Sequence, residues 1–255
     1  MLTPDIDRYL ELRRAMGVKL VDTERCLRSF ARFADQRGDI CLISQTAVAW
    51  VMLASTVRRR DKRMVIVIGF ARFMHAEDSR HEVPPRTTVC RSYPRPAPYI
   101  FTPEEIRRLV QAAARLGKPG SLRPYTFSTL FNLLAVTGLR IREALTLRIE
   151  DFTPDGLVVR NTKFHKSRLV VLHETTAAAL SRYLERRQRV PTRHDYFFTS
   201  RRRTPLCYGT VHRMFRELCI EADIQGAPPA PRPRLHDLRH NVGTRNIPPT
   251  DLRCV

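Results

Sequence analysis

The sequence of 255 residues contains no apolar run of about 18 residues, the length that a helix needs to cross a bilayer. Its start, Met1–Asp5 (MLTPD), lacks the basic segment and the apolar stretch of a secretion signal. These absences exclude a membrane-spanning helix and predict a cytoplasmic protein without a membrane partner. Hydrophobic residues still make up 43% of the chain, which is enough for packed cores and excludes wholesale disorder.

Paired cysteines are also missing. No two cysteines form a C-x-x-C pair, and no histidine spacing near them suggests a zinc site. We therefore expect reduced thiols and no metal ligands at the six scattered positions, which are Cys26, Cys41, Cys90, Cys207, Cys219 and Cys254.

Lysine is scarce, since only five of the 45 basic residues are lysines. The formal net charge is +20, of which residues 91–255 carry +15 and residues 1–90 carry +5. Such a surplus favours a polyanionic partner, because cations that neutralise phosphates release condensed counterions. Arginine richness can also reflect the base composition of a genome, so the arginine count alone does not establish DNA binding.

Residues 1–80 are predicted to form a helical domain. Apolar stripes at helical spacing predict four helices, over residues 6–16, 22–36, 45–55 and 58–74. Residues 81–101 form a predicted linker, because the prolines at 84, 85, 94, 96 and 98 favour extended backbone.

Residues 102–255 are predicted to form a second domain, which begins with a helix start at Thr102–Glu105 (TPEE). Helices are expected over residues 102–116, 122–136, 141–147, 175–188 and 210–222, with a last one from Leu235. Strands over 156–160 and 168–172 should form a hairpin with a basic tip, and a short strand is expected over 195–199. The predicted fold class is therefore mainly α with a small β-hairpin or sheet.

Three patterns in the second domain occur in a fixed order. They are Thr137–Leu145 (TGLRIREAL), Lys163 at the hairpin tip and Leu235–His240 (LHDLRH). Together they resemble the tyrosine site-specific recombinases, the phage integrase family, and the likeness covers most of the chain. The resemblance implies an N-terminal helical core-binding domain of the SAM-like type, a proline linker and a catalytic domain with a minor β component. It also implies DNA breakage and rejoining, as in DNA integration.

The arginines of these motifs suit phosphoryl transfer. Planar guanidinium forks match the oxygens of a phosphate and stay protonated, so Arg140 and Arg239 are predicted to clamp the reacting phosphate. Glu143 lies three residues after Arg140 on the same helical face and is expected to orient it. His236, three residues before Arg239, fits the family's first histidine, which accepts a proton or holds a phosphate oxygen.

Lysine differs from arginine in that its pKa can be tuned to donate a proton. The resemblance implies one lysine that protonates the departing 5′ oxygen, and alignment of the hairpin places it at Lys163. Lys166 is the alternative because hairpin register is easily misjudged by a few residues. If Lys163 has this role, Lys166 is expected to contact DNA.

A basic run lies in the first domain, and it has two interpretations. It is either a solvated helix face or a surface that grips the phosphate backbone. On the second interpretation the expected DNA-binding residues are Arg58, Arg59, Arg60, Lys62 and Arg63.

The chain departs from the family pattern in its tyrosines. The family's nucleophile is a tyrosine downstream of the second arginine, but all seven tyrosines of this chain precede Arg239. We therefore expect a C-terminally truncated member that is inactive in cis. The alternatives are a catalytically dead DNA-binding decoy and a non-functional gene remnant. The resemblance further implies double-stranded DNA as partner, self-association on DNA, no cofactor or metal, and a nucleoid-associated location in a bacterial, phage or mobile-element context.

Overall fold

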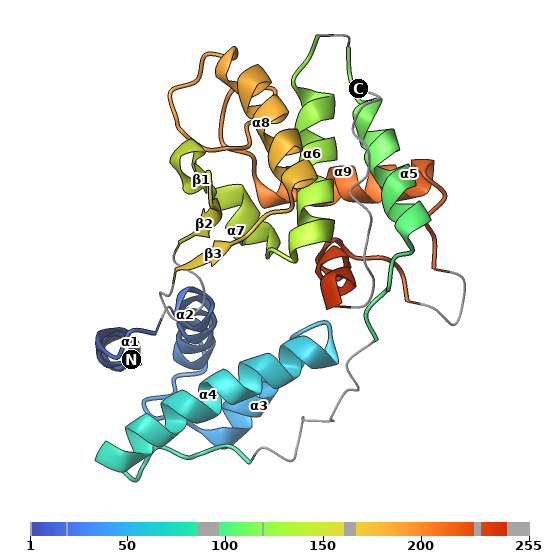
Figure 1. The fold of residues 1–255 in the computed structure, drawn as a ribbon. Coiled ribbons are helices and arrows are strands. Elements are labelled where there is room, and N and C mark those ends of the chain that lie inside the picture. Colours follow the sequence, from blue (N-terminus) through green and yellow to red (C-terminus); the bar gives the residue numbers. More distant parts are fainter. Residues whose placement is uncertain are drawn as a thin grey trace. The chain divides into compact units, whose positions relative to one another are not determined.

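The computed structural model describes residues 2–18, 20–85, 97–118, 120–160, 167–226 and 231–243. The chain divides into two compact units, Met1–Arg95 and Pro96–Val255. The described residues are mainly helical with one small antiparallel sheet, which confirms the predicted fold class (Figure 1). Within these ranges no helix is long and apolar enough to cross a membrane.

The described residues of the Met1–Arg95 unit form four helices around one apolar core. They are α1 (Thr3–Ala15), α2 (Val21–Asp35), α3 (Ser44–Met52) and α4 (Val57–Glu77). All four predicted helices are present, with ends that differ by a few residues. The core includes Phe30 of α2 and Trp50 of α3, whose ring centroids lie 5.5 Å apart in an edge-on arrangement. Burial of these large side chains contributes to the stabilisation of this unit.

The Pro96–Val255 unit is built around α6 (Arg123–Thr137), which is buried on most sides and packs against α5 (Pro103–Ala114), α8 (Glu174–Gln188) and other elements. The remaining helical elements are α7 (Ile141–Thr146), η2 (Ile149–Asp151), α9 (Tyr208–Glu221) and η3 (Leu235–Gly243). The predicted helix start at Thr102 is confirmed. Its hydroxyl accepts from the Glu105 N–H at 3.1 Å, and the Glu105 carboxylate accepts from the Thr102 N–H at 2.7 Å.

The sheet has the order β1–β2–β3, with β1 (Phe152–Thr153), β2 (Gly156–Val159) and β3 (Arg168–Val170) all antiparallel. The predicted hairpin is therefore present, and Val159 pairs with Arg168 at its outer end. Gly156 is required by this register. Its φ is +134°, and a Cβ there would lie 2.3 Å from the Val170 carbonyl oxygen.

Two predicted elements differ from the structure. Residues 195–199 form isolated bridges, Arg148 to Tyr196 and Thr199 to Pro205, and no continuous strand. On one side the backbone pairing consists of Ile149 N–H to Asp195 and Phe197 N–H to Leu147, and on the other the chain turns back where the Ser200 N–H donates to the Thr204 carbonyl at 2.9 Å. The stretch from Leu235 is a 3₁₀ helix, which has three residues per turn instead of 3.6.

Candidate functional site

Arg140 follows a sharp turn at the end of α6. Gly138 adopts the left-handed conformation with φ of +63° and caps α6, its N–H donating to Leu134. Left-handed backbone is accessible to glycine without a Cβ penalty, which accounts for Gly138 in this turn. The backbone of Arg140 is extended, and Arg140 is the N-cap residue of α7. Its side chain therefore lies at the N-terminal end of this helix.

Glu143 connects this arginine to a second one. The carboxylate Oε1 accepts from Arg140 Nη1 at 2.7 Å, and Oε2 accepts from the Arg140 backbone N–H at 2.9 Å. Arg168 of β3 donates to the same oxygens, from Nη1 to Oε1 at 3.3 Å and from Nη2 to Oε2 at 2.8 Å. The Glu143 side chain is 8% exposed, whereas those of Arg140 and Arg168 are 41% and 39% exposed. One buried carboxylate thus holds two half-exposed guanidinium groups.

The electrostatics of Glu143 follow from this geometry. Burial by itself would raise the pKa of this carboxyl group. The hydrogen bonds from Arg168, from the Arg140 backbone N–H and from the Arg140 side chain outweigh burial and lower the pKa to about 2. Glu143 is therefore ionised throughout the physiological range and can orient Arg140, as the sequence suggested.

Sequence reasoning assigned no role to Arg168. It is 25 residues away from Glu143, and only the β2–β3 register brings the two side chains together. The sequence did contain one indication that Arg168 lies near the site. It is the first residue of the predicted returning strand, so it lies at the base of the hairpin tip that carries Lys163.

The second arginine motif lies on η3. Leu235 and Leu238 are buried in the core, while His236 is exposed and Arg239 is half-buried. Asp237 is completely buried and accepts hydrogen bonds from Arg234, including Nη2 to Oδ1 at 2.8 Å and the backbone N–H to Oδ2 at 2.9 Å. With three residues per turn, positions 236 and 239 fall on the same side of η3.

η3 packs against α6, and Figure 1 shows it beside the C-terminal end of α6, which leads directly to Arg140. The fold therefore packs the segment that carries His236 and Arg239 against the helix that leads to Arg140.

His236 is suited to accept a proton. Although the side chain is exposed, partial desolvation of the ring by its neighbours, followed by the electrostatic effect of His240 and Arg239, lowers its pKa below the ordinary value. Its ring lies 5.5 Å from that of His240, centroid to centroid. The imidazole is thus neutral near pH 7, with a nitrogen lone pair available for a proton or a hydrogen bond.

Lys163 and Lys166 lie outside the described residues. The strand that precedes them, β2, ends at Val159, and the Nε of the next residue, Arg160, donates to the buried Asp151 Oδ1 at 2.5 Å. Both described ends of this hairpin are therefore tied by an arginine to a buried carboxylate, Arg160 to Asp151 and Arg168 to Glu143.

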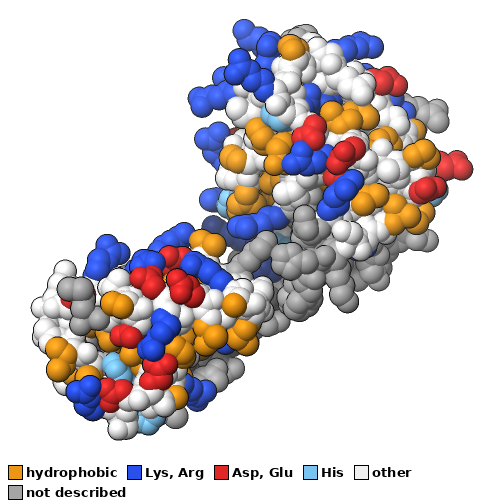
Figure 2. All heavy atoms as spheres, turned by 90° about the vertical axis from the view of Figure 1, so that its left-hand side faces the viewer, with side chains coloured by type: hydrophobic (Ala, Val, Ile, Leu, Met, Phe, Trp, Pro, Cys, Tyr) orange, Lys and Arg blue, Asp and Glu red, His pale blue; other side chains and the backbone are white. Residues whose placement is uncertain are grey.

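The basic run of α4 divides into two groups. Arg60 donates to the Ala54 carbonyl at 2.9 Å, Arg63 donates to the Trp50 carbonyl at 3.0 Å, and Lys62 pairs with Asp22 at 2.9 Å. Arg58 and Arg59 are exposed and form no ion pair with any described residue; the Arg59 side chain donates to the Ser55 hydroxyl. Figure 2 shows acidic and basic side chains intermixed on the visible face of this unit.

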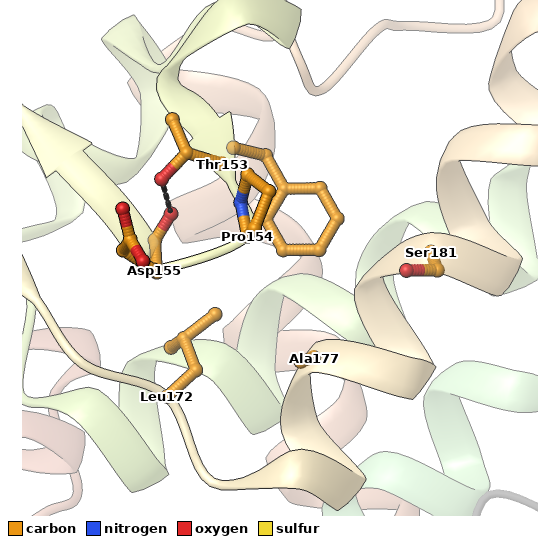
Figure 3. Close-up of a pocket in the computed structure, with 8 residues that line it drawn as sticks. Thr153, Pro154, Asp155, Leu172, Ala177 and Ser181 are labelled. Carbon is orange, nitrogen blue, oxygen red and sulfur yellow. Dashed lines mark hydrogen bonds between the residues drawn. The ribbon is translucent and has the colours of Figure 1, made fainter.

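A separate hollow of about 390 Å³ lies between the β1–β2 turn and α8 (Figure 3). Its lining residues are Phe152, Thr153, Pro154, Asp155, Gly156, Leu172, Ala177 and Ser181. No predicted site residue lines it, and the hydrogen bond drawn there, from the Thr153 hydroxyl to the Gly156 carbonyl at 3.1 Å, closes the turn on itself. We assign this hollow no part in the site.

Comparison with known proteins identifies the group to which this architecture belongs. The model of the "Phage integrase family" matches residues 100–248, which include all the motifs described above. The chain belongs to the phage integrase family, the tyrosine recombinases. The Sinorhizobium fredii protein y4rB, provisionally named an integrase/recombinase, is 36% identical over 252 residues, covering 95% of this chain and 80% of that protein. The tyrosine recombinase XerD of Caulobacter vibrioides is 30% identical over 210 residues, covering 79% and 65%.

The fold agrees with that of a solved member of the family. A lambda integrase dimer (residues 75–356) bound to a COC′ core site superposes with a TM-score of 0.67 at 20% identity, covering 94% of this chain and 88% of that chain. At this identity the likeness concerns the fold, and the roles of individual residues rest on the geometry described here.

Proposed function

We propose that this chain binds double-stranded DNA and holds one phosphate of the backbone between the α7 and η3 segments. The observation that carries the proposal is the Arg140–Glu143–Arg168 cluster. It fixes the Arg140 guanidinium group on the buried carboxylate of Glu143 in α7, directly after α6, and η3 packs against α6. Arg140 and Arg239 would form paired hydrogen bonds to the non-bridging oxygens and stabilise the charge that develops on them.

The other residues have complementary roles in this proposal. His236, neutral at pH 7, would accept a proton or hold a phosphate oxygen. Lys163 would protonate the departing 5′ oxygen, with Lys166 as the alternative or as a DNA contact. Arg58 and Arg59, which have no carboxylate partner among the described residues, are better placed to reach DNA phosphates than Arg60, Lys62 and Arg63.

Self-association on DNA is also part of the proposal. Solved relatives of the same fold include a lambda integrase dimer on a COC′ core site and a lambda integrase tetramer on a Holliday junction. We infer that copies of this chain would likewise assemble on DNA, which would associate the protein with the nucleoid.

These 255 residues include no tyrosine after Arg239. We therefore propose that this polypeptide by itself binds DNA without breaking it, because positioning and charge stabilisation still require an attacking group. Its activity in cis would be absent, and its effect at recombination sites would be that of a decoy.

A fluorescence-anisotropy titration with a labelled duplex tests the DNA-binding part. If about six phosphates are contacted, affinity should fall by roughly 10³ between about 50 and 200 mM salt. A flat salt dependence would contradict the proposed DNA clamp.

A denaturing gel with nicked DNA substrates tests the catalytic part. We expect no covalent protein–DNA adduct from this polypeptide alone. An adduct formed without an added partner would show that the chain contains a nucleophile outside the family pattern, and mass spectrometry of the adduct would identify it.

A further inference from the structure

The two arginines on Glu143 use their donors differently. Arg168 places both terminal nitrogens on the carboxylate, Nη1 at 3.3 Å and Nη2 at 2.8 Å. Arg140 uses only Nη1 of its side chain, at 2.7 Å, together with its backbone N–H. Among the described residues the Arg140 side chain forms no other hydrogen bond, so its Nε and Nη2 edge remains available to an anion, whereas the fork of Arg168 is occupied.

A carboxylate that is 8% exposed must remain paired, because an unpartnered buried charge is strongly destabilising. If Arg140 were its only partner, a phosphate on Arg140 would compete with Glu143 for the same guanidinium group. The fork of Arg168 keeps Glu143 paired and oriented while Arg140 presents its other edge to the phosphate.

We propose that Arg168 is a positioning residue for Arg140 and acts on it through their shared carboxylate, Glu143. Arg168 belongs to β3 and lies opposite Val159 in β2, so the orientation of Arg140 depends on the register of this hairpin. The inference rests on the proposed function, since it assumes that Arg140 contacts a DNA phosphate.

The test is a double-mutant cycle on the affinity for a labelled DNA duplex. We expect Arg168→Met and Arg140→Met each to weaken binding about fivefold, the effect of losing one charge-assisted hydrogen-bonding group. The double variant should bind no more weakly than Arg140→Met alone, because both substitutions remove the same phosphate contact. Effects that multiply would show that Arg168 contacts DNA directly or stabilises the fold independently, and would overturn the proposal.

Two further variants separate positioning from net charge and from folding. Arg189→Met removes an exposed arginine at the end of α8 remote from β3 and should change the affinity less than about twofold (Figure 1). Arg168→Lys keeps the charge but cannot form the fork, so it should bind like Arg168→Met. Wild-type affinity of Arg168→Lys would contradict the proposal, and this variant remains informative even if Arg168→Met fails to fold.

Chemical rescue by guanidinium distinguishes positioning from a purely structural role, because added guanidinium would not restore DNA affinity if Arg168 were only structural. Millimolar guanidinium should restore the affinity of Arg168→Ala relative to the same concentration of sodium, and it should not restore that of Arg189→Met. Absence of rescue in a folded Arg168→Ala variant would overturn the positioning role. If the wild-type chain bound no duplex at all, the proposed function would fail and this inference with it.

Discussion

The two units of the chain place their ion pairs differently. In the Met1–Arg95 unit the paired carboxylates are on the surface, with side chains from 29% exposed at Glu24 to 62% at Asp22. In the described part of the Pro96–Val255 unit three paired carboxylates are buried: Glu143 at 8%, Asp151 at 4% and Asp237 at 0%. Each of these three is held by at least one arginine that is itself partly exposed.

Each buried carboxylate lies in or next to a segment that carries a predicted site residue. Glu143 holds Arg140, Asp237 lies between His236 and Arg239, and Asp151 holds the strand that leads toward Lys163. A buried ion pair contributes little net stability compared with apolar packing, but separating it is costly, so it restricts the local geometry. The comparison indicates that the second unit uses buried charge where side-chain orientation matters, while the first unit relies on apolar packing.

The largest effect is expected at Asp237. Asp237→Asn removes a fully buried carboxylate whose two oxygens both accept from Arg234 and puts an amide NH₂ donor against those donors, so we expect the free energy of unfolding of this unit to fall by about 3 kcal/mol. Trp50 is the only tryptophan and belongs to the other unit, so denaturant titration should shift the far-UV circular dichroism transition and leave the tryptophan fluorescence transition unchanged.

The matched control for Asp237→Asn is Glu24→Gln. Glu24 pairs with Arg14 and Arg28 on the surface, where ion pairs are screened by water and salt. We expect no measurable shift of either transition. Equal losses of unfolding free energy in the two variants would show that the buried and the surface carboxylates do not differ in this respect.

A smaller effect is expected at Glu143, where Glu143→Gln should lower the free energy of unfolding by about 2 kcal/mol at neutral pH. The pKa of Glu143 is about 2 in the folded protein, below the ordinary value of 4.5. Its stabilisation is therefore complete above pH 4.5 and disappears as the pH falls toward 2. The stability difference between wild type and variant should shrink over this range, and a difference that grows with acidification would contradict the assignment.

The local parts of this site were predictable from the sequence. The Gly138 turn, the spacing of Arg140 and Glu143, and the spacing of His236 and Arg239 each depend on residues a few positions apart. The parts that were missed depend on tertiary contacts. Arg168 reaches Glu143 only through the sheet register.

The error at residues 195–199 has the same origin. Apolar residues in this segment resemble a strand, but their pairing partners are limited to short stretches on either side. Single-sequence periodicity reports which residues are buried and does not report how many partners a segment will find.

The smallest effect is expected in the basic run of α4. Arg63 lies over the Trp50 ring, 4.4 Å from its centroid, and donates to the Trp50 carbonyl, so Arg63→Met should cost about 1 kcal/mol and shift the tryptophan fluorescence transition. Arg58→Met should leave that transition unchanged and weaken duplex binding about twofold. The opposite pattern would show that Arg63 contacts DNA and that Arg58 is structural.

The central claim is that Arg140, held by Glu143, binds a DNA phosphate together with the η3 residues. The most direct test is a structure of this chain bound to duplex DNA. We expect one backbone phosphate to lie within hydrogen-bonding distance of both Arg140 and Arg239, with the Arg168 fork still on Glu143. A complex in which every phosphate contact lies elsewhere, or in which Arg140 remains turned away from the DNA, would contradict the account.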